Sequence, residues 1–385
     1  MQRTLRFHPQ IILPCLPPCL AALALAAGTG TARADDDLPP LSLSGFARLD
    51  VLADDSQMSD ILAPMYVLLE GHHGHTDGEM TMTPRLSRVG LDLDRWDVGS
   101  YTTGEGALEI DFAGGAGTSA IRLRQAYGKL SFWHMVEIVA GQTTDLISPL
   151  IPAAASDTEL VFAGNTGSRR PQLQLAVTGD QLRAGVAVAA NGSLARVDAD
   201  GDGRIDGMAS ARPMLQWLVE WHSPLHGDEF RLGAWGHVAS AELAGGGGYG
   251  GESFGIHAYV PVSRRVVVLG EGYVGSNLAD IGGGIAQAYN PTLQRTVRGG
   301  GGWLELAMAA SDRHLVALGA STDLAREDDV DTGAPTRNST AYGAVRYKPR
   351  TAVEVGLEYL VWSTRYKLVG YGIANRVDLH LSLLF

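Results

Sequence analysis

The sequence predicts an all-β protein, and within that class a transmembrane antiparallel β-barrel with about sixteen strands. Three observations support this prediction. Apolar and polar residues alternate with a period of two in many segments, helical spacing never persists beyond two turns, and the chain ends on an aromatic residue, Phe385. The final segment shows the alternation most clearly, since its apolar positions are Val377, Leu379, Leu381, Leu383 and Phe385.

Composition removes several other classes of protein. The chain has 385 residues and a formal net charge of −12, which argues against a nucleic-acid partner because such a partner requires a basic surface. No stretch after the first thirty residues has the ~18 uninterrupted apolar residues that a spanning helix needs. Both cysteines, Cys15 and Cys19, lie near the N-terminus. We therefore expect no disulfide framework, no thiolate metal site and no required cofactor in the exported chain.

The N-terminal residues have the pattern of an export signal. Arg3 and Arg6 supply a positive start, residues 11–27 are mostly apolar, and Ala32-Arg33-Ala34 is a small-residue cleavage site. We therefore predict a signal peptide over residues 1–34, a short periplasmic segment over 35–40 and the barrel over 41–385. Cleavage removes three arginines and no acid, so the mature chain has a net charge of −15.

Alternation defines the strands in chain order. In residues 104–113, the apolar Leu108 and Ile110 alternate with the acidic Glu109 and Asp111. Residues 168–178 and 351–362 show the same alternation of apolar and polar residues. Fourteen or eighteen strands remain possible besides sixteen. The sixteen predicted segments are 41–52, 79–94, 104–113, 120–132, 135–143, 168–178, 181–190, 211–222, 228–240, 253–261, 265–275, 299–309, 314–323, 338–348, 351–362 and 374–385.

The connections favour a membrane barrel over a soluble sandwich or propeller. Segments of about ten residues match the ~9–11 that cross a bilayer at a tilt, and their connections alternate between short and long. An even count places both ends of the barrel on the periplasmic side. The short turns then lie at 179–180, 223–227, 262–264, 310–313 and 349–350, and the long exterior loops at 53–78, 144–167, 191–210, 276–298, 324–337 and 363–373.

Several stretches resemble known porins. Ser87-Arg88-Val89-Gly90-Leu91 and Arg124-Gln125-Ala126-Tyr127 are similar to the second and fourth strands of general bacterial porins, and Ala140-Gly141-Gln142 to the end of the fifth. More specifically, the chain resembles the DcaP-like porins, an outer-membrane group linked to dicarboxylate uptake. The stretches that carry this resemblance are 45–50, 141–150, 270–277 and 301–303. Members of that group often have a helical extension before the barrel, where this chain has only residues 35–40.

The resemblance implies a homotrimeric sixteen-stranded porin in the Gram-negative outer membrane, whose third exterior loop folds into the lumen. Its partners would be outer-membrane lipid, small hydrophilic or anionic solutes, and the assembly machinery that reads Phe385. Loop acids would face wall arginines across the constriction, and the positions that match are Asp145, Asp157, Glu159, Arg88, Arg124 and Arg170. Strand alternation independently predicts that the side chains of Arg48, Arg122, Arg124 and Arg170 face the lumen.

Opposed charges at a constriction produce a transverse field, which attracts anions to the basic side. We therefore expect passive diffusion of small hydrophilic solutes with a preference for anions or dicarboxylates, and no enzymatic activity. One alternative is that the arginines only neutralise interior acids such as Asp92, Glu109 and Asp111. Two other functions also remain open, a barrel enzyme of the lipase or protease type and a structural or adhesin barrel with a closed pore.

A second motif lies in the fourth predicted exterior loop. Asp198, Asp200 and Asp202 have the spacing that begins a calcium-binding loop, Gly203 permits the turn, and Asp206 occupies the ninth position. Ala209 stands where a bidentate Glu would complete the coordination shell. Both a calcium-stabilised loop and a solvated acidic turn are compatible with this pattern.

Overall fold

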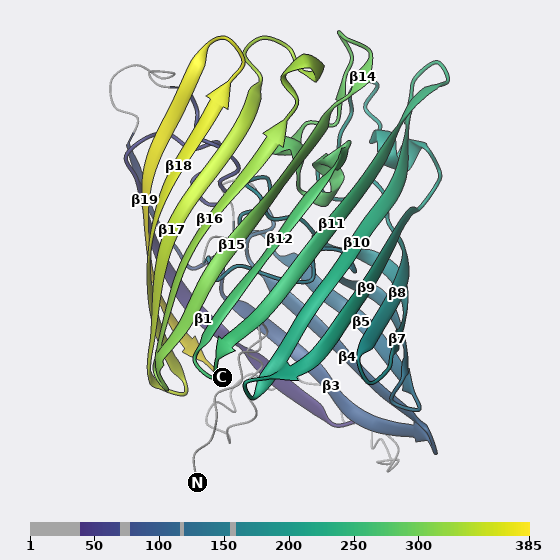
Figure 1. Cartoon of the computed structure of the whole chain (residues 1–385), viewed down its shortest axis with the longest axis vertical. Coiled ribbons are helices and arrows are strands. Elements are labelled where there is room, and N and C mark those ends of the chain that lie inside the picture. The colour runs from purple at the N-terminus through teal and green to yellow at the C-terminus, as the bar shows by residue number, and fades with distance from the viewer. Residues whose placement is uncertain (1–38, 70–77, 116–118, 155–158) are drawn as a thin grey trace, which may run out of the picture.

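The computed structural model describes residues 39–69, 78–115, 119–154 and 159–385. The predicted signal peptide and most of the 35–40 segment lie outside these residues. Antiparallel strands form one sheet that closes on itself, because β1 pairs with β19 as well as with β2 and β3 (Figure 1). No helix in the described part of the chain is long and apolar enough to span a membrane.

The predicted barrel of sixteen antiparallel strands is confirmed. β2 and β3 pair with opposite halves of β1 and share one barrel position, so seventeen sheet strands fill sixteen places. The barrel strands are β1 (Leu41–Asp54), β2 (Glu79–Thr83), β3 (Arg88–Gly99), β4 (Thr102–Asp111), β5 (Arg122–Phe132), β6 (Val136–Thr144), β7 (Arg169–Thr178), β8 (Leu182–Ala189), β9 (Met214–Leu225), β10 (Asp228–Leu243), β11 (Gly247–Ser263), β12 (Val266–Ser276), β15 (Arg298–Ser311), β16 (His314–Ala325), β17 (Pro335–Arg350), β18 (Val353–Tyr366) and β19 (Gly370–Leu384).

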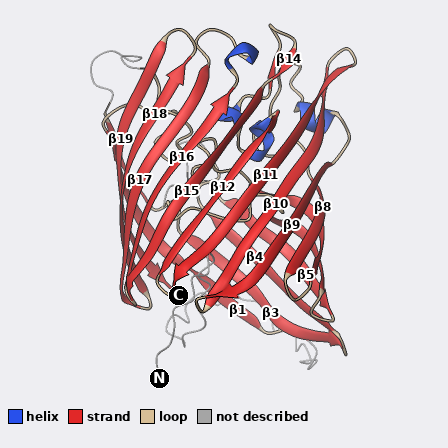
Figure 2. Ribbon diagram, in the orientation of Figure 1, coloured by secondary structure: helices blue, strands red, loops and turns tan. Residues whose placement is uncertain are grey.

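The remaining elements are short and lie at one end of the barrel. Figure 2 shows the helical turns at the end opposite the C-terminus, where the long connections are. We call this the exterior end and the opposite end, with its short turns, the periplasmic end. The short elements are α1 (Asp206–Ala209), η1 (Leu278–Ile281), η2 (Gly284–Ala286), η3 (Glu327–Asp329), β13 (Tyr289–Asn290) and β14 (Arg295–Thr296).

The two faces of each strand differ as the alternation predicts. On β19, Leu379 and Leu383 point outward with 44% and 53% of their surface exposed, whereas Asp378 and His380 point inward and are buried. The outside of the barrel is therefore an apolar belt and the inside is polar, which is the arrangement of a barrel that crosses a membrane.

Two strand boundaries differ from the prediction for local reasons. The predicted strand 79–94 is interrupted between Thr83 and Arg88, where Pro84 has no N–H for the ladder and its carbonyl accepts a turn hydrogen bond from Ser87. β10 ends three residues after its predicted end and β11 begins six residues before its predicted start, so that the two strands meet at a three-residue turn at 244–246. The Gly-rich stretch after that turn has no apolar alternation, yet its backbone pairs residue by residue with β10.

Three segments from the exterior end fold into the lumen, although the sequence predicted only one. They comprise residues 55–69, residues 145–154 with 159–168, and residues 277–297, and apolar side chains join them to the wall and to each other. Leu146 and Ile147 of the second segment pack with Leu278 and Ile281 of the third. Met58 and Val67 of the first form a separate cluster with Leu160 of the second and the wall of β17–β19.

The last residue closes the barrel. Phe385 and Gly45 exchange two backbone hydrogen bonds of 3.0 and 3.1 Å, which extend the β1–β19 seam. Gly45 has φ +149°, and a Cβ on it would lie 2.3 Å from the carbonyl oxygen of Arg88 and 3.0 Å from the Phe385 ring. The seam therefore requires a glycine at this position, where the C-terminal ring covers the backbone.

We expect deletion of Phe385 to reduce the folded, heat-modifiable fraction of the protein. The deletion removes both seam hydrogen bonds and the ring, so that the closing edge of the barrel loses partners that lipid cannot replace. Gel mobility of heated and unheated membrane fractions measures the effect. Phe385→Tyr keeps the backbone pair and the ring and serves as the control. Normal assembly of the deletion variant would refute a role for Phe385 in closure.

Candidate pore and its charged wall

The chain leaves β6 at Asp145, and residues 145–154 and 159–168, which we call the inserted loop, lie inside the lumen. Wall side chains accept hydrogen bonds from the loop backbone: Gln216 from the Leu146 N–H at 2.8 Å, and Glu271 from the Leu150 N–H at 2.7 Å. Farther along, Glu305 accepts from the Ala153 N–H at 2.7 Å. These acceptors belong to β9, β12 and β15, so the loop spans the barrel and the predicted insertion is confirmed.

The wall formed by β3–β7 lies across the lumen from the strands that hold the inserted loop. It carries four arginines, Arg88, Arg122, Arg124 and Arg169. We call them the basic wall. Arg124 is 2% exposed and lies between Glu109 at 2.6 Å and Asp111 at 2.8 Å. Arg122 forms a 2.6 Å contact with the same Asp111 carboxylate. The ion pairs thus fix the guanidinium groups of β5 in place.

Two members of the basic wall keep surface open to the lumen. The side chains of Arg88 and Arg122 are 30% and 31% exposed, and Arg88 lies 3.8 Å from Glu109. Glu159 of the inserted loop interacts electrostatically with Arg88 and Arg169. Four arginines against the three carboxylates Glu109, Asp111 and Glu159 leave one net positive charge. The basic wall thus lies on one side of the lumen here and the inserted loop on the other.

Charged residues continue along the same wall toward the periplasmic end. Lys129 contacts Glu105 and lies 3.3 Å from Glu137, and Arg183 lies 3.9 Å from Glu137. These side chains are between 22% and 35% exposed. A partly exposed charged surface thus extends along the inside of the wall, as expected of a water-filled path.

Arg170 points inward, as predicted, but it does not line the open lumen. It is fully buried and bound to Asp145 at 2.7 Å and Asp280 at 2.9 Å. Its guanidinium also donates to the backbone carbonyls of Asp280 and Ala190. Asp145 further accepts from the Gln216 amide at 2.8 Å. The prediction that Arg170 and Asp145 face the solute across the constriction is therefore wrong, because together they join β7 to the inserted loop and to segment 277–297.

The other predicted constriction residues have different positions. Arg48 is 13% exposed and donates to Asp50 at 2.7 Å through its Nε. Arg88, Arg122 and Arg124 lie in the basic wall, and Glu159 faces it. Asp157 lies outside the described residues. Sequence reasoning missed Arg169, because strand alternation from Arg170 places it outward. Arg169 is the first residue of β7, where the pleat no longer dictates direction, and it interacts with Arg124 and Glu159.

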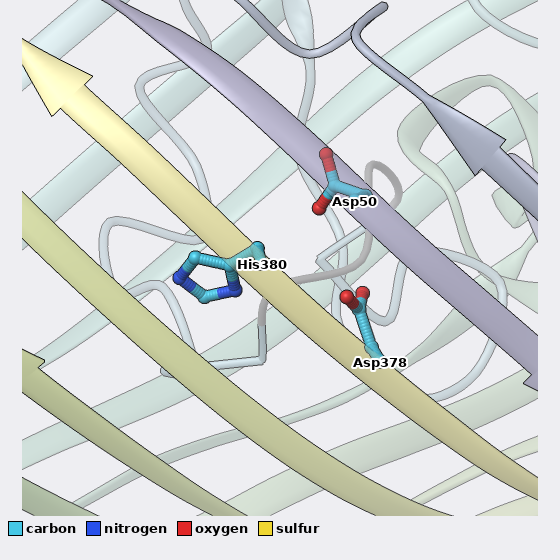
Figure 3. A group of neighbouring side chains, drawn as sticks. All are labelled: Asp50, Asp378 and His380. Carbon is cyan, nitrogen blue, oxygen red and sulfur yellow. The ribbon is translucent and has the colours of Figure 1, made fainter.

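A group with metal-ligand residue types lies on the inner face of β1 and β19. Asp50 is directly opposite His380 in the strand register, and Asp378 is two residues away on the same face. Figure 3 shows the carboxylates of Asp50 and Asp378 directed into the same space, and the ligand atoms of all three lie within 4.8 Å of one another. Arg48 and Arg376 interact with Asp378, but Arg48 also binds Asp50 and Arg376 binds Asp54, so two arginines serve three carboxylates. Sequence analysis did not find this group because its members come from opposite ends of the chain.

Three of the four predicted calcium ligands converge. Carboxylate oxygens of Asp198, Asp200 and Asp206 lie within 4.8 Å of one another. Asp202 is not part of this group, and its side chain accepts a hydrogen bond from the Arg204 N–H at 2.7 Å. Burial and the neighbouring carboxylates raise the pKa of Asp206, although it accepts a 2.7 Å hydrogen bond from the Tyr249 hydroxyl. The loop thus brings three acids together and turns the fourth away.

Comparison with known proteins identifies the fold. No family model and no curated protein sequence matches the chain. Among solved structures, the outer-membrane channel DcaP of Acinetobacter baumannii superimposes with a TM-score of 0.74 at 17% identity, covering 90% of this chain and 98% of that one. An anion-selective porin from Comamonas acidovorans gives a TM-score of 0.60 at 12% identity, with 90% and 99% coverage.

A trimer form of OmpT, an outer membrane protein of Vibrio cholerae, gives a TM-score of 0.58 at 12% identity, with 91% and 100% coverage. These comparisons confirm, at the level of the fold, the resemblance to DcaP-like porins that the sequence motifs indicated. The chain has the architecture of a sixteen-stranded porin-type barrel with a loop inside its lumen.

We expect Arg170→Ala to destabilise the barrel by about 3–5 kcal/mol, because it leaves Asp145 and Asp280 buried without their shared cation. The temperature at which the folded band is lost on a gel measures this effect. Arg122→Ala is the control, since a partly exposed ion pair contributes about 0–1 kcal/mol. An Arg170→Ala protein with unchanged thermal stability and altered ion selectivity would instead place Arg170 in the solute path.

Proposed function

We propose that this chain is an outer-membrane porin through which small hydrophilic solutes diffuse passively, with a preference for anions such as dicarboxylates. The basic wall carries the proposal. Its exposed arginines lie beside the inserted loop, where the lumen is narrowed, and ion pairs hold them in fixed positions. The apolar outer belt of the closed barrel supports location in a membrane.

Local charge decides selectivity because screening is short-ranged. At physiological salt the Debye length is ~8 Å, so acids on the exterior loops contribute little at a constriction farther away than that. Two unit charges 4 Å apart interact by about 4 kcal/mol at an effective dielectric constant of 20. A fraction of this value is enough to change ion preference several-fold. The strongly acidic mature chain can therefore hold a pore that prefers anions.

A dicarboxylate suits this wall better than a single halide ion does. Arg88 and Arg122 belong to the same wall, and 30% and 31% of their side-chain surface is exposed. Guanidinium groups bind carboxylates through paired hydrogen bonds, so two carboxylates on one solute can engage two arginines. The alternative of pure charge neutralisation describes Arg124, which is 2% exposed, better than it describes these two.

We further propose that the protein forms trimers through the wall of short strands, β4–β8, which we call the low wall. β4–β8 have 8–11 residues, whereas β10, β11 and β17 have 16 or 17. The low wall thus spans little more than a bilayer, and its outward residues include exposed Leu108, Leu173 and Leu175. The wall that contains the long strands β10, β11 and β17 extends beyond the membrane. We therefore expect it to lie at the periphery of the trimer.

The structure offers little support for a barrel enzyme. A serine and a histidine do form a 2.6 Å hydrogen bond at Ser253 and His237. His237 is 1% exposed, and within the described residues no carboxylate forms an ion pair with it. The pair therefore lacks both substrate access and the third group that orients a catalytic histidine.

We also propose that Asp198, Asp200 and Asp206 bind calcium and stiffen the exterior loop between β8 and β9. Carboxylate oxygens that surround one position are the ligands calcium prefers. Asp206 joins this loop to the β10–β11 hairpin through Tyr249, so an ion here would fix the loop to the barrel.

Replacing Arg88, Arg122 and Arg169 together with alanine should shift the zero-current potential toward cations and lower succinate flux several-fold. Flux of a neutral sugar should change little, and the difference should shrink at high salt, because the effect is electrostatic. Planar-bilayer recordings and liposome swelling measure these quantities.

The matched control is a triple variant at periplasmic turns, Arg264→Ala with Arg265→Ala and Arg313→Ala, which removes the same charge outside the constriction. Equal loss of all solutes in the basic-wall variant would show that these arginines are structural. An absence of conductance in the wild-type protein would favour a closed structural barrel.

Calcium should protect the loop between β8 and β9 from added protease, and Asp198→Asn with Asp200→Asn should abolish that protection. The substitutions keep the shape of the side chains and remove the charge that holds the ion. Asp202→Asn is the control, because Asp202 lies outside the convergent group. Equal cleavage in calcium and in chelator would refute binding by the wild-type loop.

A further inference from the structure

Four arginines stand at the exterior end of the outer face of β15–β18. Arg298, Arg326, Arg337 and Arg365 each lie at or next to the exterior end of their strand, on the outward-facing row or its continuation. The side chains of Arg298, Arg326 and Arg365 are 50%, 52% and 63% exposed. We call these four residues the arginine rim. They lie outside the barrel, on the opposite surface of the sheet from the lumen.

The depth of the rim follows from strand geometry. On β18 the outward positions from Val353 to Val361 are all apolar, and Ser363 and Arg365 follow. A strand rises about 3.4 Å per residue, so at a tilt near 45° it climbs about 2.4 Å per residue along the membrane normal. The apolar positions thus cover most of a belt about 25 Å tall. Arg365 lies at its outer edge, at the level of lipid headgroups.

A hollow lies beside the arginines because the neighbouring outward positions have small side chains. Its volume is about 650 Å³, its floor includes the backbone of Gly299–Gly301, and Val274 and Leu324 line its apolar part. All four residues of the arginine rim line the hollow. The hollow therefore combines an apolar surface with a basic edge.

A row of hydroxyl groups runs just below the rim. Thr322, Ser339 and Ser363 lie side by side in the strand register, and the first two share a 2.9 Å hydrogen bond. Outward hydroxyl groups at this depth are suited to the amide, ester and sugar groups that lie between a lipid headgroup and its acyl chains.

The arginines repel one another. Arg337 is directly opposite Arg365 in the register, and Arg326 donates its backbone N–H to the Arg298 carbonyl at 2.8 Å. Like charges placed opposite one another destabilise a sheet unless an anion compensates them.

Acids within the chain compensate the rim only in part. Arg298 binds Asp329 through two 2.7 Å contacts, which lower the pKa of Asp329. Asp328 and Glu327 lie 3.5 Å from Arg326 and Arg365, respectively, and both are exposed. Among the residues that the structure describes, no acid forms an ion pair with Arg337. The rim therefore has unmatched positive charge at headgroup depth.

We propose that the arginine rim binds the phosphate groups of lipopolysaccharide, the phosphorylated and acylated glycolipid of the outer leaflet. Guanidinium groups bind phosphate oxygens in pairs, the hydroxyl row meets the linkage region, and the uppermost parts of the acyl chains fill the hollow. This assignment rests on the proposed outer-membrane location. It is independent of what passes through the lumen, because the rim lies on the other surface of the sheet.

The test measures binding of a bisphosphorylated lipid A to the detergent-solubilised full-length protein by native mass spectrometry. Arg337→Ala with Arg365→Ala should weaken binding by about tenfold or more, since hydrogen bonds to charged groups are lost. Removing both phosphates from the lipid should weaken binding to the wild-type protein by a similar factor. Arg337→Lys with Arg365→Lys keeps the charge and should retain part of the affinity even if the alanine variant folds poorly.

Arg204→Ala with Arg212→Ala is the matched control, because it removes two exposed arginines from the loop between β8 and β9 and should leave binding unchanged. Unchanged binding in a folded rim alanine variant, or equal affinity for the dephosphorylated lipid, would overturn the proposal. Equal affinity for phosphatidylglycerol would overturn the assignment to a glycolipid, and loss of trimers without loss of lipid would assign the rim to contacts between copies. Conductance and selectivity should be unchanged in the rim variant, so failure here is distinct from failure of the porin proposal.

Discussion

Closure of the sheet is the constraint on which the rest of the molecule depends. A bilayer core offers no hydrogen bonds to a free strand edge, so every N–H and C=O of the wall must find a partner within the protein. β1 therefore pairs with β19, and the first and last parts of the chain become neighbours in space. The pair between Gly45 and Phe385 completes this seam. Sixteen strands joined in this way enclose a lumen that must be filled with water, loops or both.

The inner wall holds its loops with polar groups rather than with a continuous apolar core. Glu271 and Glu305 accept backbone N–H groups of the inserted loop, whose described residues form no helix or strand that would satisfy them. Apolar clusters add to this where segments 55–69 and 277–297 meet the loop. The position of the constriction thus depends on wall carboxylates in strands far from the loop in sequence.

Arginine has three different roles in this barrel, and burial distinguishes them. Arg170 is enclosed by two carboxylates and joins β7 to the inserted loop and to segment 277–297, so its charge is neutralised within the protein. Arg88 and Arg122 pair with acids but keep a partly exposed surface toward the lumen. The arginine rim faces away from the lumen at the edge of the apolar belt. Net charge predicts none of these roles, because each depends on which surface of the sheet a side chain occupies and on what lies beside it.

The alternation in the sequence by itself determined the barrel, a strand count near sixteen and the alternation of short and long connections, whereas the insertion of the third loop was implied by the resemblance to porins. Period-two alternation is a local property, and lipid outside with water inside makes it nearly obligatory along each strand. Tertiary structure alone decided which inward residues stay exposed to the lumen. Alternation could place Arg170 on the inner face, but the burial of Arg170 comes from Asp280, 110 residues away. In the same way, Arg169 turns inward because it begins a strand, and Asp50 meets His380 because the barrel closes. Pairing between distant segments depends on loop conformation and closure, for which a single sequence holds no periodic signal.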